Sequence, residues 1–360
     1  MMTVLKKIGL NLLLVFIPVT LALEHLAADR PALIFLAAAL GIIPLAGLIV
    51  QATEQIAHRT GDAIGGLLNA TFGNAPELII AFVALRAGLN DMVRASLVGA
   101  ILANMLLGLG LAFLLGGLRY HDQEFNPRGT QMQVSLMIMA VISLMVPGTF
   151  HNIVSAETLH LERYLNAGVA VVLLISYALY LVFMLKTHPE VFACEQLHCK
   201  EEGVCWPVGK AVGLLVAASV GAAWMSEILV GAVEGASHDL GISKTFIGLV
   251  VLAVVGGAAE LGSAVAMGRK DRMDLAISIA VGSSIQISLF VAPVLVLLSL
   301  FVAPVPFVLA FSPAGLLLLF MTVLISTVVA SGGRSNWYKG VQLLTIYLIF
   351  AILFFLFPGG

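Results

Sequence analysis

The sequence predicts an all-α polytopic membrane protein with eleven transmembrane helices: one N-terminal helix followed by two five-helix inverted-topology repeats. Three observations lead to this fold class. The 360-residue chain is 60% hydrophobic and only 11% charged, whereas about a quarter of a soluble domain is charged. One stretch of sequence occurs twice, and the basic residues are distributed unevenly between the segments that join the apolar runs.

Apolar runs of about 20 residues follow one another with short polar joints, which is typical of a multi-span helical protein. The mean hydropathy of +1.07 agrees with this. We expect the spans at 9–27, 31–57, 62–87, 91–117, 131–148, 164–186, 208–233, 244–267, 273–301, 304–329 and 338–357.

The chain divides into four parts. Residues 1–30 hold the extra helix, whose Lys pair and apolar run lack a clear cleavage site, so we expect a retained span and not a signal peptide. Residues 31–186 form the first repeat with spans 2–6, and residues 207–360 form the second with spans 7–11. A polar linker, 187–206, joins them.

The repeat is centred on two glutamates. Glu77 lies in an otherwise uncharged run, and the pattern around it returns 183 residues later around Glu260 without a gap. Both copies place small residues and an acid at the same spacing. The matching pairs are Gly65/Gly248, Ala70/Ala253, Gly73/Gly256, Ala75/Ala258, Glu77/Glu260, Leu78/Leu261, Ala81/Ala264, Asp91/Asp274 and Gly99/Gly282.

The basic residues predict the orientation, because Lys and Arg are retained on the cytoplasmic side. With the N-terminus inside, thirteen of the 18 basic residues fall on the inner side. The N-terminus is then cytoplasmic and the C-terminus outside. Glu77 and Glu260 consequently lie on spans that run in opposite directions, which makes the repeat an inverted one, as in secondary transporters. The five basic residues outside are Arg30, Arg86, Arg94, Arg163 and Lys244.

The charged residues that cannot be placed at a span end are all acidic: Glu54, Glu77, Glu227, Glu234 and Glu260. An acid at a span centre costs about 2.5–3.5 kcal/mol on insertion scales. We expect no buried basic partner for them, so protons or a bound cation would neutralise them. The alternative is a protonated glutamate that only bonds another helix, which the matching positions of Glu77 and Glu260 disfavour.

The residues around each glutamate suit a cation. Pro76 should open the backbone near Gly73, and the carbonyls there and the Asn74 side chain are hard oxygen ligands of the kind Ca²⁺ takes. In the second copy, Gly256 and Gly257 would allow the break, although such glycines also serve close helix packing.

Further polar residues are expected at membrane depth. They could ligate a cation, relay a proton or simply bond another helix: Asn104, Ser283, Ser284 and Gln286. Gln51 matches Glu234 at the repeat offset, and Glu54 and Glu227 lie near that pair. We interpret these four as candidates for a mouth or a proton shuttle.

The linker contains all three cysteines of the chain, Cys194, Cys199 and Cys205, together with His188 and His198. An odd number of cysteines on a cytoplasmic loop argues against a disulfide framework. Four of these Cys and His side chains together could bind Zn²⁺, or the acidic residues of the linker could sense Ca²⁺. The spacing, however, matches no standard zinc motif. An ordinary solvated loop is the favoured interpretation.

The motifs themselves resemble a known family. GLLNATFGNAPELIIAFVALRAG followed by SLVGAILANMLLGLG resembles the first conserved repeat of the calcium/proton antiporters, and GGAAELGSAVAMGRKDRMDLAISIAVGSSIQISLFVAPVLV resembles the second. With IIPLAGLIVQATEQIAHRTG in the second span, the resemblance covers essentially the whole chain. It implies ten core helices in two inverted halves, with the two repeat glutamates binding Ca²⁺ and protons alternately.

The sequence departs from that family pattern at three positions. Gly257 and Leu261 stand where the second repeat usually has Asn and His, and Gln51 stands where the second span usually has an acid. The second half therefore offers fewer side-chain ligands and proton carriers than the first.

We therefore expect a secondary transporter, not an enzyme, that exchanges Ca²⁺ or another divalent cation for H⁺ in a prokaryotic plasma membrane. Ca²⁺ is its substrate, and no cofactor is implied. A sodium/calcium exchanger of the same fold is the alternative, which the GNAPE motif disfavours. An intramembrane hydrolase would need His or Cys at a span centre. Partners other than these ions and the lipid bilayer are not indicated; without a basic stripe, nucleic acid is not expected.

Overall fold

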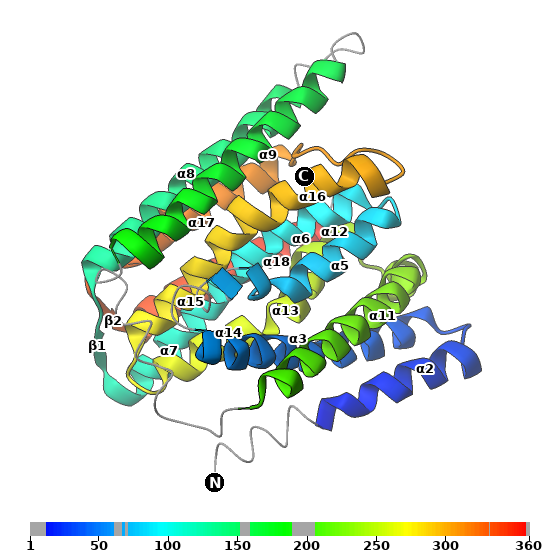
Figure 1. Cartoon of the computed structure of the whole chain (residues 1–360), viewed down its shortest axis with the longest axis horizontal. Helices are drawn as coiled ribbons and strands as arrows, with labels where there is room; N and C mark the ends of the chain where they lie inside the picture. Colours follow the sequence, from blue (N-terminus) through cyan, green and yellow to red (C-terminus); the bar gives the residue numbers. More distant parts are fainter. Residues whose placement is uncertain are drawn as a thin grey trace.

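The computed structural model describes residues 12–60, 67–68, 71–151, 159–188, 206–330 and 332–357 (Figure 1). In the first half, the chain follows η1 (Leu13–Val15), α2 (Phe16–Leu26), α3 (Pro31–Thr60), α5 (Ala75–Arg86), α6 (Asn90–Leu102), η2 (Ala103–Gly108), α7 (Leu109–Tyr120), β1 (Asp122–Glu124), α8 (Pro127–His151), α9 (Leu159–Val182) and η4 (Phe183–Thr187).

The second half repeats this helical character. It contains α11 (Val208–Leu240), α12 (Lys244–Phe246), η7 (Ile247–Leu252), α13 (Ala253–Gly256), α14 (Ala258–Gly268), α15 (Met273–Gln286), η8 (Ile287–Val291), α16 (Ala292–Val302), α17 (Pro313–Ala330), β2 (Arg334–Asn336) and α18 (Trp337–Leu356). Four segments of the two halves are π-helical turns that widen a longer helix: η2 and η4 in the first half, and η7 and η8 in the second.

A polytopic membrane fold is confirmed at a coarse level. Within the described residues, eight helices are long and apolar enough to cross a bilayer, and a ninth span results if the pair Lys244–Gly256 and Ala258–Gly268, bent by 59°, counts as one. Leu13–Leu26 is a shorter apolar helix. The predicted third span, 62–87, includes residues outside the described ranges, so the count of eleven stays a prediction.

The predicted tenth span, 304–329, is wrong at its start. Residues 303–312 contain no helix, and α17 begins at Pro313. Pro306 disfavours a helical conformation for the residue before it, and the backbone N–H groups of Phe307 and Leu309 donate to the Ser299 hydroxyl and the Asn166 side-chain oxygen and not to a helical turn. Ser312 then accepts a hydrogen bond from the Gly315 N–H, as an N-capping residue does.

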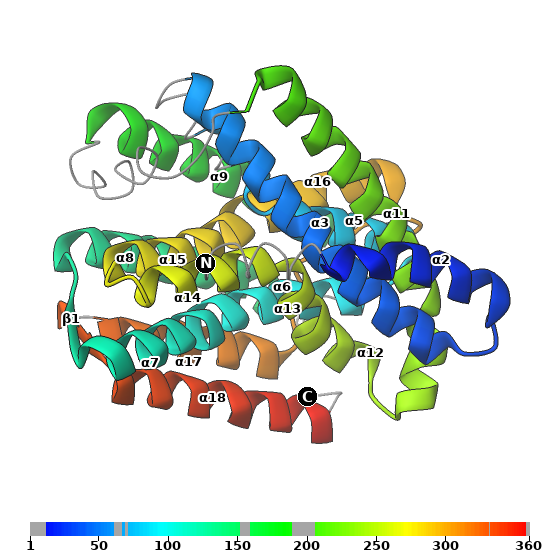
Figure 2. The same ribbon diagram turned by 90° about the horizontal axis from the view of Figure 1, so that it is seen from below.

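Helices α2, α3 and α11 lie together at one side of the molecule in both views (Figures 1 and 2). Helices α3 and α11 run antiparallel, as their end contacts show. At one end the Gln55 side chain accepts a hydrogen bond from the Trp206 N–H, and at the other a Cβ on Gly235 would meet the Pro31 ring at 2.4 Å. These two helices occupy corresponding places in the two repeats.

Glycines let the halves approach each other closely. A Cβ on Gly99 of α6 would lie 1.9 Å from the Leu249 carbonyl oxygen, and one on Gly248 would lie 2.6 Å from the Met92 carbonyl oxygen. Helix α6 and the π-helical turn η7 therefore pack backbone against backbone. Small residues at such contacts are the usual means of helix association in membranes.

The structure repeats its irregular features at the same offset of 183 residues. Helices α5 and α14 begin at Ala75 and Ala258, and α6 and α15 begin at Asn90 and Met273. The left-handed residues before the latter two helices, Gly88 and Asp271, also correspond. The π-helical turns η2 and η8 follow at matching places.

The all-α prediction missed one small sheet. Strands β1 and β2 pair antiparallel, with Gln123 opposite Ser335. The buried Gln123 donates hydrogen bonds from Nε2 to the Gly268 carbonyl and to Asp271. The strand pairing joins the segment after α7 to the segment before α18, and Gln123 joins both to the loop after α14. In Figure 1 the sheet lies at the left edge of the molecule, at the end of α8 that is far from His151.

Candidate cation-binding site

Two helix starts form the frame of the site. The chain turns at Gly73 and Asn74 before α5, where Pro76 stands in the first turn, and it bends at Gly257 before α14. Proline suits a first helical turn because the N–H it lacks would have no intrahelical partner there. The breaks expected from Pro76 and from the Gly256–Gly257 pair are thus confirmed.

Each helix start presents a buried glutamate as its third residue. The side chains of Glu77 and Glu260 belong to residues only 7% and 8% exposed. Within the described residues, neither carboxylate oxygen of Glu77 has a hydrogen-bond partner, and Oε2 of Glu260 also lacks one. The first turn of a helix favours an anion, but these unpartnered oxygens still require a proton or a cation.

Glu77 lies against the chain just before Glu260: a Cβ on Gly257, three residues earlier, would lie 3.5 Å from Glu77 Oε1. Gly256 makes the approach possible, because a Cβ there would lie 3.1 Å from Glu77 Cγ. The α13–α14 break therefore packs directly on the stem of Glu77. The structure brings together the two acids that the repeat predicts as a pair.

Amide and hydroxyl groups connect the halves beside the carboxylates. Ser283 Oγ donates to Asn74 Oδ1 at 2.7 Å and accepts from Asn104 Nδ2 at 2.8 Å. Asn74 Nδ2 also donates to Gln286 Oε1 at 2.7 Å. Four of the predicted polar residues thus form one network on α5, η2 and α15.

The other predicted polar residue on α15 faces elsewhere. The Ser284 hydroxyl donates to the Ala280 carbonyl of its own helix at 2.9 Å and not to a residue of the network. Adjacent residues of a helix point in different directions, but the sequence does not show how the helix is turned. Sequence spacing therefore could not tell which of Ser283 and Ser284 faces the site.

The remaining predicted acids stand apart from this network. Glu54 is exposed on α3, a helix that packs against α14, on which Glu260 lies. Two of them nevertheless have exposed basic partners, because Glu227 pairs with Arg86 at 3.6 Å and Glu234 with Lys244 at 2.6 Å. Both pairs are accessible to solvent, so the acids are satisfied without a proton or cation. Gln51 is half-buried on α3.

Among the residues that the structure describes, no three His, Cys, Asp or Glu side chains cluster as a metal site would require. A cation between Glu77 and Glu260 must therefore take its further ligands from neutral oxygens, as Ca²⁺ does. Of the linker residues considered for Zn²⁺, only His188 is described; Cys194, His198, Cys199 and Cys205 fall outside the described residues.

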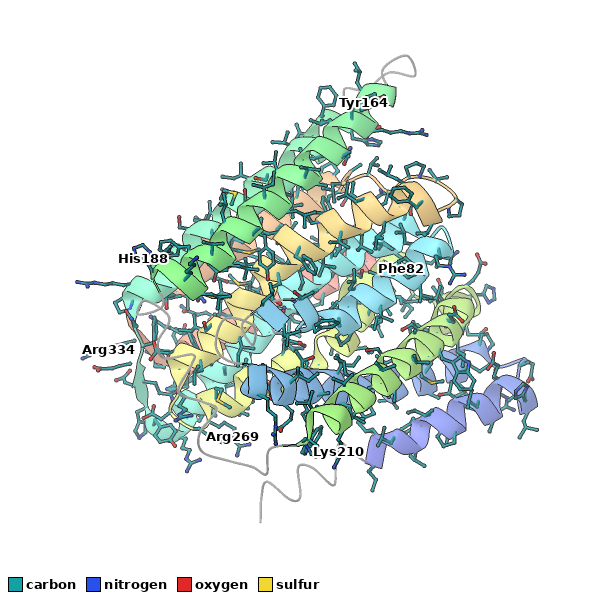
Figure 3. The ribbon with its side chains drawn as sticks, viewed as in Figure 1. Phe82, Tyr164, His188, Lys210, Arg269 and Arg334 are labelled. Carbon is teal, nitrogen blue, oxygen red and sulfur yellow. The ribbon has the colours of Figure 1, made fainter. Side chains whose placement is uncertain are left out.

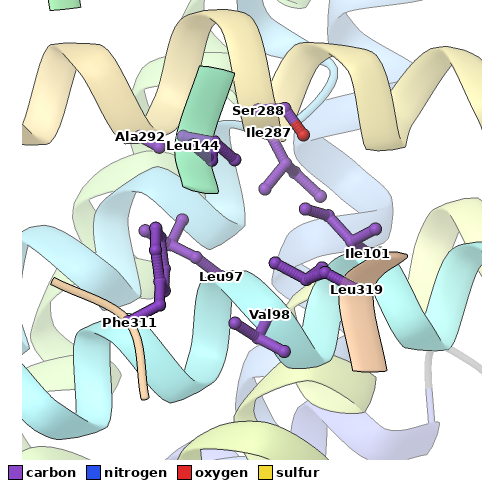
Figure 4. Close-up of a pocket in the computed structure, with 9 residues that line it drawn as sticks. All are labelled: Leu97, Val98, Ile101, Leu144, Ile287, Ser288, Ala292, Phe311 and Leu319. Carbon is purple, nitrogen blue, oxygen red and sulfur yellow. The ribbon is translucent and has the colours of Figure 1, made fainter. Parts of the chain in front are cut away.

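A small apolar pocket elsewhere does not compete with this site. It lies among Leu97, Leu144, Phe311 and their neighbours (Figure 4). Its one polar lining residue, Ser288, donates its hydroxyl to the Ser284 carbonyl. None of the described residues that line this space is charged, so it offers nothing to an ion.

The sequence profile of the sodium/calcium exchanger protein family matches residues 30–186 and 210–356. The chain belongs to this family. The exchanger is 42% identical over 364 residues to the Ca²⁺/H⁺ antiporter of Aphanothece halophytica, with 96% of each chain covered. It is 40% identical over 329 residues to the Ca²⁺/H⁺ antiporter ChaA of Bacillus subtilis, covering 90% of this chain and 92% of that one.

Solved structures agree. The exchanger superimposes on the structure of native YfkE with a TM-score of 0.83 and 36% identity, covering 96% and 99% of the two chains. The H⁺/Ca²⁺ exchanger CAX shares the fold, with a TM-score of 0.70 at 15% identity. The resemblance to calcium/proton antiporters is thereby confirmed.

One departure of this exchanger from the family pattern has a visible consequence. Leu261, in place of the usual His, is buried, and its Cδ2 atom lies 2.7 Å from the position of a Cβ on Gly108. The side chain fills the space that the Gly108 hydrogen leaves on η2. This position contributes packing and no proton carrier.

Proposed function

We propose that the chain is a Ca²⁺/H⁺ antiporter working by alternating access, with Glu77 and Glu260 binding the cation and protons in turn. The observation that carries this proposal is the pair of buried carboxylates with unpartnered oxygens at two matching helix starts. The names of the relatives from Aphanothece halophytica and Bacillus subtilis support the choice of ions.

The chemistry follows from charge balance. Two carboxylates carry two negative charges, which one Ca²⁺ or two protons neutralise. Moving an uncompensated charge through a region of low dielectric constant is costly, so only a neutralised site crosses between the two access states. A doubly protonated pair cannot also hold the cation. The two fluxes are therefore coupled without any covalent step.

The finer architecture belongs to the same proposal. Eleven spans, with an extra helix in 1–30, repeats in 31–186 and 207–360 and the linker 187–206, fit the matched helix starts at Ala75 and Ala258. The antiparallel course of α3 and α11, which occupy corresponding places, supports the inverted relation. Transport sites at the interface of inverted repeats are typical of secondary transporters.

We place the protein in a prokaryotic plasma membrane with the N-terminus inside and the C-terminus outside. In Figure 3, Lys210, Arg269 and Arg334 lie along one edge, and Tyr164 lies at the far opposite tip. The three basic residues belong to the predicted cytoplasmic set, whereas Tyr164 follows Arg163 of the outer set. This distribution supports the orientation.

Glu54 is the best candidate for a mouth residue in this scheme. It is exposed, and it lies on α3, the helix that packs against both α13 and α14 around the second glutamate. Gln51 lies one helical turn earlier on the same helix. We assign Glu227 and Glu234, which have basic partners, to contacts between α11 and the neighbouring helices.

The test is proton-driven uptake of Ca²⁺ into proteoliposomes. We expect Glu77→Gln and Glu260→Gln each to abolish uptake driven by an imposed pH gradient, because one charge can no longer be exchanged. Glu124→Gln removes an exposed acid paired with Arg334 and serves as the control, with uptake near the wild-type rate. Near-normal uptake by either site variant would refute the assignment. Uptake driven by a Na⁺ gradient at clamped pH would instead identify a sodium/calcium exchanger.

A further inference from the structure

The two halves of the site differ in their polar side chains at several linked positions. In the first half, the residue before α5 is Asn74, which bonds to Ser283 and Gln286 on α15. At the repeat offset of 183 residues, the positions equivalent to Asn74, Ser283 and Gln286 carry no polar side chain. Their equivalents are Gly257, Ala100 and Ala103.

The missing side chain at residue 257 would point at the cation site. A Cβ on Gly257 would lie 3.5 Å from Glu77 Oε1 and 3.7 Å from Asn104 Oδ1. Glu77 Oε1 is buried and has no hydrogen-bond partner among the described residues. The glycine therefore leaves a space bordered by two oxygens that can accept a proton or ligate a cation.

The network holds one of these oxygens in place. Asn104 donates its Nδ2 to Ser283 Oγ, so the amide oxygen is turned away from Ser283. It is this Oδ1 atom that borders the space at Gly257. Ser283 is in turn fixed by its own bond to Asn74. The polar network between the halves thus orients the Asn104 oxygen of the first half toward the bare position of the second.

We propose that Gly257 determines how this exchanger coordinates its cation, by leaving one ligand position beside Glu77 Oε1 and Asn104 Oδ1 to a water molecule. The inference rests on the proposed function. Ca²⁺ takes six to eight oxygen ligands, including waters, in flexible geometry. An Asn at this position, as at residue 74, would supply that ligand from the protein. In this chain the cation keeps a water there instead.

Substitutions at residue 257 separate this role from simple space filling. The backbone there, with φ −80° and ψ 11°, is accessible to any residue and is close to that of Asn74. A Cβ would lie 3.1 Å from the Ala253 carbonyl oxygen, a tight contact that Ala and Asn variants share. Ala displaces the water without replacing it as a ligand, whereas Asn brings an amide oxygen.

The experiment measures the KM for Ca²⁺ in proton-driven uptake by proteoliposomes. We expect Gly257→Ala to raise KM about tenfold, corresponding to the loss of one ligand, and Gly257→Asn to restore it to within about threefold of wild type. Gly262→Ala, on the same helix with nothing within 4 Å of the added methyl, is the matched control with unchanged KM. Thermal unfolding in detergent identifies any variant that does not fold.

The outcomes are distinct. An unchanged KM in Gly257→Ala, or a higher KM in Gly257→Asn than in Gly257→Ala, overturns the inference, because the larger side chain would then act by bulk alone. If Gly257→Ala does not fold, Asn104→Ala is the second test, because it removes the neutral oxygen that borders this space. An unchanged KM for Ca²⁺ in Asn104→Ala overturns the inference equally. A wild-type protein without proton-driven Ca²⁺ uptake would instead refute the proposed function.

Discussion

Single uncharged residues decide how the two carboxylates are presented. Ser283 uses both capacities of its hydroxyl group, donating to Asn74 and accepting from Asn104. A hydroxyl offers one donor and two acceptor sites, so this side chain can bridge two amides from different segments. The position of the Asn104 oxygen near Glu77 consequently depends on a residue that carries no charge.

We expect Ser283→Ala to lower the affinity for Ca²⁺ by about tenfold or more, because a buried polar group left without its partner costs roughly 1–3 kcal/mol. The adjacent Ser284→Ala is the matched control, since its hydroxyl bonds only to the Ala280 carbonyl. Isothermal titration of the detergent-solubilised proteins with Ca²⁺ measures both. Equal losses in the two variants would contradict a specific role for Ser283.

The residue scale also shows where sequence reasoning succeeds. Glu77 and Glu260 could be paired because an acid in an apolar run is rare and both occur at one offset. The bridge by Ser283 could not be predicted, because it depends on how η2 turns Asn104 toward α15. The basic partners of Glu227 and Glu234 were missed for a similar reason: each pair joins separate helices.

At the scale of elements, the irregular turns carry the architecture. The π-helical turn η2 contains Asn104, and η8 follows Gln286 at the corresponding place in the other half. Such turns are frequent at functional sites because they re-aim the side chains that follow. The apolar runs of the sequence located the long helices but could not indicate these widened turns. They also extended the tenth span across the prolines at 304 and 306.

The close contact between α6 and η7 gives a prediction at this scale. Gly99→Ala places a methyl group 1.9 Å from the Leu249 carbonyl oxygen, so one helix must move. We expect a loss of thermal stability of at least several degrees, because backbone cannot give way as a side-chain end can. Melting curves from the purified protein in detergent measure it.

The repeat itself supplies the control for this substitution. Gly282 corresponds to Gly99 at the 183-residue offset, but nothing lies within 4 Å of a methyl group added there. Gly282→Ala should melt at the wild-type temperature or slightly above it, since alanine favours a helix over glycine. Equal destabilisation by the two substitutions would show that the packing of α6 on η7 is not the cause.

For the whole molecule, the acids divide the protein into a coupling centre and its surroundings. The buried pair at the two helix starts is neutralised by its cargo, and Glu227 and Glu234 are neutralised by Arg86 and Lys244. Glu54 is an exposed acid on α3, which packs against α13 and α14 beside this centre. The number of protons exchanged per cation depends on whether Glu54 belongs to the centre or only to its mouth.

We expect exchange of one Ca²⁺ for two protons, because Glu77 and Glu260 are the two acids buried together in the part of the chain that the structure describes. Such an exchange moves no net charge, so the uptake rate in proteoliposomes should not change when a K⁺ gradient with valinomycin imposes a membrane potential of about 100 mV, worth about 2.3 kcal/mol per charge moved. Wild-type uptake that responds to the potential would contradict this stoichiometry. If Glu54→Gln then abolished the response, the third proton would be assigned to Glu54, which would belong to the coupling centre and not only to its mouth.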